Sequence, residues 1–142
     1  MLIKQISVFV ENKPGRMAAI MKALADNNID ISALSIADTT DFGVLRMIVA
    51  DADKAKQVLR DAGVVVKTTD VLAVSMEDKP GGLAAILNVI NDGETTIDYM
   101  YAFAGRGKAG AMVVIKANNP EKAIELLENA GFKVADSETI FG

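Results

Sequence analysis

The hydrophobic and polar positions of this chain follow two alternating periods, and the same succession of periods occurs twice. Near the start, Ile6, Val8 and Val10 are apolar at every second position, which is the period of a β-strand. Four later segments have apolar residues at the spacing i, i+3, i+4, i+7, which is one face of a helix. These faces are formed by Met17, Ile20, Met21 and Leu24; by Ala55, Val58, Leu59 and Ala62; by Leu83, Ile86, Leu87 and Ile90; and by Ala123, Leu126, Leu127 and Ala130.

Strand patterns surround these helices in both halves of the chain. The expected strands are residues 3–10, 29–36, 44–49 and 64–66, and then residues 71–76, 96–103, 111–116 and 132–135. Turn chemistry is expected at residues 39–43 and in the glycine-rich stretch 105–110. Either Asp51 or Asp53 is expected to cap the second helix, and Asn119 followed by Pro120 marks the start of the fourth. The tail, residues 138–141, is expected to form an edge strand.

Each half therefore has the order strand-helix-strand-strand-helix-strand, which is the split βαβ pattern of ferredoxin-like folds. The predicted fold class is α+β, with two ferredoxin-like βαββαβ units in tandem and both helices of each unit on one face of an antiparallel sheet. The expected domains are residues 1–68 and 69–142, with a short joint at 67–70. Matching landmarks are offset by 66 residues early in each half and by 68 later, so we expect a short insertion near residues 92–95.

The composition removes several classes of function. The chain has 142 residues, of which 51% are hydrophobic, and its net charge is -4. It has no Cys and no His, so the commonest catalytic bases and metal ligands are missing. We expect no catalytic residues, no metal site and no cofactor. Lys and Arg are scattered, which argues against nucleic acid. No stretch is apolar enough for a membrane span and no signal peptide is evident, so we expect a cytoplasmic protein.

One polar motif occurs at the first strand-to-helix corner of each half. It reads Asn12-Lys13-Pro14-Gly15-Arg16-Met17 in the first half and Asp78-Lys79-Pro80-Gly81-Gly82-Leu83 in the second. The start of a helix leaves backbone N–H groups without intrahelical partners, and these groups can hold a carboxylate or a phosphate. The side chains of Asn12 and Asp78 have two interpretations, as caps of the helix or turn and as contacts to a ligand.

The duplicated corner, placed after a strand in a βαββαβ unit of this size, resembles the ACT domain. Nearly the whole chain resembles two ACT domains in tandem without an attached catalytic domain. Two further segments, Asn28-Ile29-Asp30-Ile31 and Thr96-Ile97-Asp98-Tyr99, open the second strand of each half and fit the same pattern. The resemblance implies a regulatory protein that binds a small molecule, most often an amino acid, between ACT domains that pair side by side.

In that arrangement the corner of one domain faces the start of the second strand of its neighbour. The ligand contacts that the resemblance implies are Asn12, Pro14, Gly15, Arg16, Met17, Asn28, Ile29, Asp30, Ile31, Asp78, Pro80, Gly81, Gly82, Leu83, Ile97, Asp98 and Tyr99. The implied partners are an amino acid, a second copy of the chain in a homodimer, and a metabolic enzyme. Since Asn12 is replaced by Asp78 and Arg16 by Gly82, we expect two corners of unequal affinity.

Two other functions are open. The chain can act as a ligand-independent module for oligomerisation or for docking on an enzyme. It can also be a hydrolase that uses Arg16 and an Asn, but no convergent set of carboxylates is visible, and we expect that the protein is not an enzyme. Residues 105–110 match the letters of a dinucleotide fingerprint, G-x-G-x-x-G. A strand rather than a helix follows them, which favours a hairpin loop.

Overall fold

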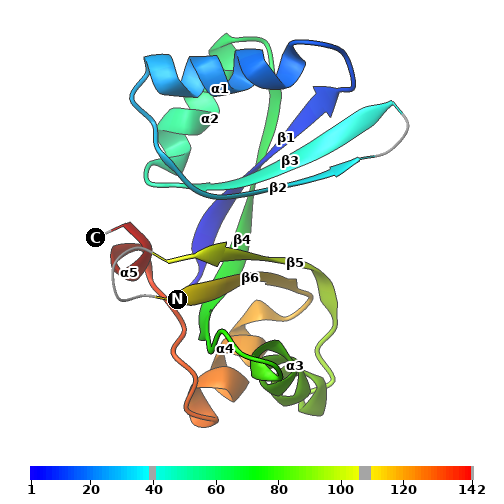
Figure 1. The fold of residues 1–142 in the computed structure, drawn as a ribbon, viewed down its shortest axis with the longest axis vertical. Helices are drawn as coiled ribbons and strands as arrows, with labels where there is room; N and C mark the ends of the chain where they lie inside the picture. Colours follow the sequence, from blue (N-terminus) through cyan, green and yellow to red (C-terminus); the bar gives the residue numbers. More distant parts are fainter. Residues whose placement is uncertain (39–40, 106–109, 142) are drawn as a thin grey trace. The chain divides into compact units, whose positions relative to one another are not determined.

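A computed structural model of the chain describes residues 1–38, 41–105 and 110–141. Its elements are β1 (Ile3–Glu11), α1 (Arg16–Asp26), β2 (Ile31–Asp38), β3 (Phe42–Val49), α2 (Ala52–Asp61), β4 (Val65–Met76), α3 (Gly82–Asp92), β5 (Ile97–Ala104), β6 (Ala111–Ala117), α4 (Pro120–Asn129) and α5 (Ser137–Phe141). The predicted α+β class with two ferredoxin-like units is confirmed (Figure 1). Residues 39–40 and 106–109, in the two predicted turns, lie outside the described residues.

Contacts along the chain divide it into two compact units. The N-terminal unit comprises residues 4–69, and the C-terminal unit comprises residues 1–3 and 70–142. Strand β4 contains the boundary between them, which falls between residues 69 and 70 and so inside the short joint expected at 67–70. The sequence predicted separate strands at 64–66 and 71–76 on either side of that joint, and this break was wrong, because the structure has one continuous strand. The polar side chains of this stretch are Lys67, Thr68, Thr69 and Asp70, and the β-branched threonines favour an extended backbone.

The N-terminal unit has the strand order β2-β3-β1-β4, and its helices α1 and α2 cover one face (Figure 1). Strand β3 pairs antiparallel with both β1 and β2. The core lies between this sheet and the helices, because alternate strand residues point toward them. The residues of this core are Ile6, Val8, Val10, Ile20, Leu24, Leu45, Met47, Val49, Ala55, Leu59 and Val66. The apolar faces predicted for α1 and α2 thus supply the buried residues of these helices, although Ala62, the last position of the predicted α2 face, is exposed.

The C-terminal unit repeats the arrangement with the strand order β4-β6-β5 and helices α3 and α4 on one face (Figure 1). Its core is formed by Leu72, Val74, Ile86, Ile90, Val113, Ile115, Ala117, Ala123, Ile124, Leu127 and Val134. The last strand of this unit, expected at residues 132–135, is reduced to a single antiparallel bridge between Val74 and Val134. The edge strand predicted for the tail is also wrong, because Ser137–Phe141 forms the short helix α5 with Ile140 buried.

Strand register places the insertion of the second unit away from the expected residues 92–95. Leu34 opposes Met47 in the N-terminal unit, and Met100 opposes Ile115 in the C-terminal unit. Residues of β2 and the matching residues of β5 are therefore still 66 positions apart in the sequence. The offset reaches 68 only between β3 and β6. The two additional residues lie between β5 and β6. The same register matches Ile97 with Ile31 and Asp98 with Ser32, which is two positions away from the match suggested by the sequence.

Leu59 and Leu127 take the same place in α2 and α4, and both are fully buried. Replacing either by Ala removes buried methyl groups and leaves a cavity, so we expect the free energy of unfolding to fall by about 2–5 kcal/mol. Denaturation in urea measures the change. Glu125→Ala on the exposed side of α4 is the control, with an expected change under about 0.5 kcal/mol. Equal losses in Leu127→Ala and Glu125→Ala would contradict the assigned core.

Candidate functional site

The two corners share one backbone path. Gly15 and Gly81 precede α1 and α3 in the left-handed conformation, with φ of 83° and 87°. This conformation is accessible to glycine at little cost, which explains why glycine occupies both positions. The backbone N–H of Lys13 donates to the carbonyl of Glu11 at 2.8 Å, and Lys79 donates to Glu77 at 2.9 Å.

Neither corner helix has a side-chain cap, whereas the second helix of each unit does. The carboxylate of Asp51 accepts a hydrogen bond from the backbone N–H of Lys54 at 3.0 Å at the start of α2. Asn119 accepts one from Lys122 at 3.2 Å at the start of α4. Helices α1 and α3 have Gly15 and Gly81 at the capping position and lack such a bond. The first-turn N–H groups at the two corners are therefore not used by a capping side chain.

The side chains of Asn12 and Asp78 do not cap the helices that follow them, so the capping interpretation of the sequence was wrong. Both residues are exposed, and neither side chain makes a hydrogen bond within residues 1–38, 41–105 and 110–141. The backbone N–H of Asn12 donates to the carbonyl of Asp41 at 3.0 Å, which fixes the strand end in front of the corner. The amide of Asn12 is thus held near the start of α1 with its donor and acceptor capacity unused.

An exposed ion pair spans each corner. Nζ of Lys13 lies 2.9 Å from Oε2 of Glu11, and Lys79 pairs with Glu77 in the same way. The hydrogen bond from Lys13 lowers the pKa of Glu11, with smaller contributions from the charges of Lys13 and Arg16. At the other corner, the hydrogen bond to Glu77 raises the pKa of Lys79.

The corners differ in charge and in the space at the first helical residue. The charges of Glu11, Lys13 and Arg16 sum to +1, whereas those of Glu77, Asp78 and Lys79 sum to -1. Gly82 takes the place of Arg16 and is buried, and a Cβ atom added there would lie 2.0 Å from the carbonyl oxygen of Glu77. The C-terminal corner is therefore closed at the position where the N-terminal corner carries an exposed cation.

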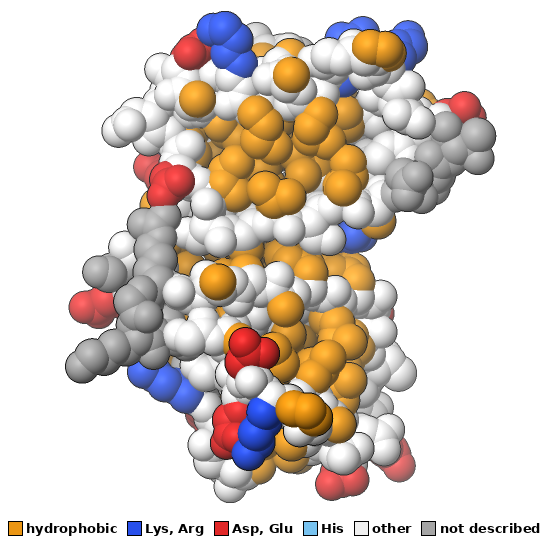
Figure 2. Space-filling model, viewed as in Figure 1, with side chains coloured by type: hydrophobic (Ala, Val, Ile, Leu, Met, Phe, Trp, Pro, Cys, Tyr) orange, Lys and Arg blue, Asp and Glu red, His pale blue; other side chains and the backbone are white. Residues whose placement is uncertain are grey.

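An apolar groove, which we call the β2 groove, opens beside the N-terminal corner. It has a volume of about 410 Å³ and is lined by Val10, Glu11, Asn12, Lys13, Met17, Met21, Leu34, Ile36, Gly43 and Leu45. Leu34 and Ile36 lie on β2, the edge strand, and each is 52% exposed. Figure 2 shows hydrophobic side chains gathered on this unit in the region of α1 and β2. The groove has an apolar wall and, at the corner, a polar end that carries both signs of charge.

The predicted site residues of the N-terminal unit fall into separate places. Asn12 and Met17 line the β2 groove, but Arg16 lines a different hollow on the other side of the corner. Residues 28–31 lie at the far end of α1, a helix of 11 residues and hence about 16 Å long. One unit alone therefore does not bring its corner and its strand start together.

Two of the strand-start residues have structural roles of their own. Asn28 has a φ of 57°, and its backbone N–H donates to Ala25 while that of Ile29 donates to Leu24. These two bonds form the C-terminal cap that ends α1. The side chain of Ile29 packs against the core. Asp30 and Ile31 follow, and the carboxylate of Asp30 accepts a hydrogen bond from the N–H of Ile31 at 3.0 Å.

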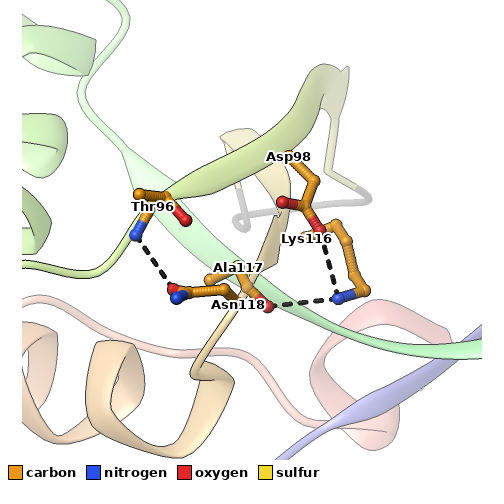
Figure 3. A network of polar contacts seen from close by, with 5 residues as sticks. All are labelled: Thr96, Asp98, Lys116, Ala117 and Asn118. Atoms are coloured by element: carbon orange, nitrogen blue, oxygen red, sulfur yellow. Dashed lines mark hydrogen bonds and ion pairs between the residues drawn. The ribbon is translucent and has the colours of Figure 1, made fainter.

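The strand start of the C-terminal unit is occupied by its own polar contacts (Figure 3). Nζ of Lys116 lies 3.5 Å from Oδ2 of Asp98 and also donates to the carbonyl of Ala117 at 3.2 Å. The N–H of Thr96 donates to the side-chain oxygen of Asn118 at 2.9 Å. The carboxylate of Asp98 is thus already paired. In the N-terminal unit the matching residues are Ser32 and Ile48, which cannot form this pair.

The sequence interpretation missed several residues around the first corner. Leu34, Ile36 and Lys13 line the β2 groove, and the two apolar residues at alternate positions of the strand expected at 29–36 were the signal that could have indicated it. Ser32 was also missed. Its hydroxyl oxygen is buried and has no hydrogen-bond partner within the described part of the chain. No sequence signal separates this serine from an ordinary strand serine.

Two classes of site are not found in the described residues. They contain no group of three or more His, Cys, Asp or Glu side chains placed to hold a metal ion. Among the same residues, no helix combines the length and the hydrophobicity needed to cross a membrane.

Comparison with protein families matches residues 1–140 to the ACT domain pair. The chain belongs to this family, which confirms the resemblance seen in the duplicated corners. ACT domain pairs are regulatory modules and are generally not catalytic.

Solved structures with the same fold include a near relative. The chain is similar to protein BT0572 from Bacteroides thetaiotaomicron, with 40% identity, 99% of this chain and 96% of that chain covered, and a TM-score of 0.92. Its fold is also that of the regulatory subunit of aspartate kinase from Thermus thermophilus in the ligand-free form (17% identity, 92% and 94% covered, TM-score 0.66). The corresponding subunit from Thermus flavus has 17% identity, 89% and 91% coverage and a TM-score of 0.60. A comparison with curated proteins found no match.

Gly82→Ala tests the closure of the C-terminal corner. The new methyl group would overlap the carbonyl oxygen of Glu77, so the backbone must shift. We expect the free energy of unfolding to fall by about 1–3 kcal/mol. Arg16→Ala, at the matching exposed position, is the control and should change it by less than about 0.5 kcal/mol. Urea denaturation of both variants distinguishes a closed corner from an open one, in which the two changes would be equally mild.

A second prediction concerns the pKa of Glu11. Because Lys13 lowers the pKa of Glu11 more than Arg16 does, Lys13→Gln should raise this pKa more than Arg16→Gln. Carboxyl chemical shifts followed by NMR across pH measure both. Since the folded pKa lies below the unfolded one, the small stabilisation from this carboxylate is present above the unfolded pKa and is lost as pH falls through the folded pKa. An unchanged pKa in Lys13→Gln would refute the ion pair in solution.

Proposed function

We propose that this protein is a regulatory protein that binds an amino acid at its N-terminal corner. The observation that carries the proposal is the β2 groove, whose apolar wall ends at a polar corner. An amino acid has the same division, with a zwitterionic end and a side chain. Lys13 and the uncapped N–H groups of α1 are donors for the carboxylate. Glu11 and the side-chain oxygen of Asn12 are acceptors for the ammonium group. Met17, Met21 and Leu34 provide contacts for an apolar side chain.

The site needs a second ACT domain to enclose the ligand, and we propose that a second copy of the chain supplies it. The β2 groove is open, and the exposed edge of β2 leaves Leu34 and Ile36 partly in water. In a two-fold arrangement, residues 28–31 of the partner would lie against the corner of the first chain, and the reverse contact would follow from symmetry. The buried, unpaired hydroxyl of Ser32 beside this strand start provides a further polar group for such an interface.

The C-terminal corner is proposed to bind more weakly or not at all. Its contacts would be Asp78, Pro80, Gly81, Gly82 and Leu83, together with Ile97, Asp98 and Tyr99 of a strand start. The corner has a net charge of -1, which disfavours the carboxylate of a ligand. Gly82 is packed on the backbone of Glu77, and Asp98 is held by Lys116. A regulatory output, such as the control of a metabolic enzyme, requires that the ligand bind one state of the assembly better than another.

Replacing Asn12 tests the proposed site. Calorimetry and thermal shift with the twenty amino acids should find at least one that binds, and Asn12→Ala should weaken its binding by about 10- to 100-fold, because a hydrogen bond to a charged group is lost. Asp78→Ala at the matching position of the other corner is the control, with an unchanged dissociation constant expected. Equal loss in both variants would contradict a preference for the N-terminal corner.

The alternative function, a ligand-independent interaction module, predicts a different result in the same experiments. No amino acid would bind at millimolar concentration, and the chain would still self-associate or capture an enzyme. The exposed edge of β2 favours this alternative as the surface it would use. Leu34→Lys should abolish association under either function, whereas only the amino-acid proposal predicts that the ligand changes the association constant. Analytical ultracentrifugation with and without the amino acid measures this difference.

A further inference from the structure

A second hollow, which we call the α2 hollow, lies on the other side of the N-terminal corner. It has a volume of about 260 Å³ and opens between the first turn of α1 and the residues after α2. Its walls include Phe9, Ala19, Phe42 and Val65, and Arg16 lies at its edge. It shares only Val10 and Glu11 with the β2 groove. A ligand in one of these sites would therefore contact a largely different set of side chains from a ligand in the other.

The backbone of the fold produces this hollow in both units. The C-terminal cap of α2 is followed by Gly63, which has a φ of 80°, and that of α4 is followed by Gly131, which has a φ of 88°. The residues around each glycine line the hollow, Ala62 to Val65 in the N-terminal unit and Ala130 to Lys133 in the C-terminal unit. A matching hollow of about 290 Å³ lies in the C-terminal unit beside Met76, Glu77 and residues 130–133. The existence of the α2 hollow is thus explained by architecture, and any function must come from its lining.

The linings of the two hollows differ at four positions that set their charge and exposed apolar surface, whereas at a fifth position Phe132 of the C-terminal hollow takes the place of Val64. Through the duplication, Phe9 corresponds to Ser75, Val65 to Lys133 and Arg16 to Gly82. Phe42 pairs with Glu11 in the N-terminal unit, and continuing the β4–β6 register one residue beyond the Met76–Ala111 pair matches Phe42 with Gly110. The N-terminal unit therefore has two aromatic rings, a valine and an arginine where the C-terminal unit has small or polar residues and a lysine.

The apolar part of this lining is exposed to an unusual degree. Phe9 is 46% exposed, Phe42 is 52% exposed and Val65 is 66% exposed. Large apolar side chains in water contribute little to folding, and a cluster of them beside a concave surface is typical of a binding site. The matching unit reaches the same fold without them. Their presence is therefore not required by the architecture.

Arg16 adds a specific chemical preference to the apolar walls. Its guanidinium makes no ion pair within 4.0 Å among the residues described, because the nearby carboxylate of Glu11 is paired with Lys13. Among the described residues it is the only cation that lines the hollow. One guanidinium matches one carboxylate in a bidentate contact. A dianion such as phosphate suits the site less, since the second charge would face Glu11 and the remaining walls carry few donors.

We propose that the α2 hollow binds a small monocarboxylate with an apolar, preferentially aromatic body. The carboxylate pairs with Arg16, and the body packs against Phe9, Phe42 and Val65. This site goes beyond the proposed amino-acid site, because it lies on the opposite side of the corner and needs no acceptor for an ammonium group. A chain with both sites would respond to two classes of small molecule.

Binding of 3-phenylpropanoate to the full chain tests the proposal. Calorimetry should find saturable binding of 3-phenylpropanoate. The affinity for the uncharged 3-phenylpropanamide should be lower by about tenfold or more, because the contact to the guanidinium is lost. Arg16→Gln should cause a loss of the same size. Lys13→Gln changes the charge of the same corner equally but lies outside the hollow, and it should retain most of the affinity. Equal affinity for acid and amide, or equal losses in the two variants, would overturn the proposal.

Substitutions copied from the other unit test the apolar walls. Phe9→Ser and Val65→Lys introduce the residues found at 75 and 133, at exposed positions where folding should be preserved, as thermal denaturation will verify. Phe9→Ser should weaken 3-phenylpropanoate at least about fivefold and leave amino-acid binding at Asn12 unchanged. A different result would contradict the proposed amino-acid function, namely that no amino acid binds while 3-phenylpropanoate still does. The proposal that the α2 hollow is a small-molecule site would be overturned if neither 3-phenylpropanoate nor 4-methylpentanoate bound. It would also be overturned if Phe9→Ser abolished self-association of the chain.

Discussion

The arrangement of each unit depends on one backbone constraint, the left-handed glycine between the first strand and the first helix. At Gly15 and Gly81 the chain must turn back over the sheet within a few residues, and φ values near +85° permit the turn. A residue with a side chain would be strained by about 1–2 kcal/mol in this conformation. Since the glycine stands directly before the helix, no side chain is available to cap it. The turn that builds the fold thus also leaves unused N–H groups at the surface.

Because the unit is duplicated, two corners with the same backbone constraint can be compared within one chain. Both units keep the glycine, the turn hydrogen bonds and the ion pair across the corner. They differ at two positions of the corner that could contact a ligand. Asn12 corresponds to Asp78, and Arg16 corresponds to Gly82. The N-terminal corner has a net positive charge, an open groove and an exposed arginine, whereas the C-terminal corner is negative and closed. Preservation of the backbone with divergence of the surface is consistent with one unit that binds ligands and one that mainly supports the fold.

Much of the fold could be predicted from the sequence, because periodicity and turn residues report on local geometry. Helices α1 to α4 and the duplicated corner were predicted correctly, and all positions of the predicted helix faces except Ala62 and Ala130 are buried or half-buried. Three features required tertiary information. The polar stretch 67–70, expected as a short joint between two strands, is part of the continuous strand β4. The tail became a helix because Asp136 accepts hydrogen bonds from the N–H and hydroxyl of Thr139, both at 2.7 Å, and Ile140 finds a buried place. The insertion was misplaced because only strand register locates it. Of the candidate site, the sequence indicated the corner but neither of the cavities beside it.

We propose that the two similar corners are unequal and that the N-terminal one binds an amino acid much more tightly than the C-terminal one. The stoichiometry of binding tests this claim most directly. Equilibrium dialysis of the full chain against the amino acid selected by screening should saturate at one ligand per chain, with a single dissociation constant, whether or not the chains pair. Saturation at two equivalent ligands per chain would contradict the account, because it would mean that charge, Gly82 and the Asp98–Lys116 contact do not distinguish the corners. Failure of every amino acid to bind would remove the proposed function itself.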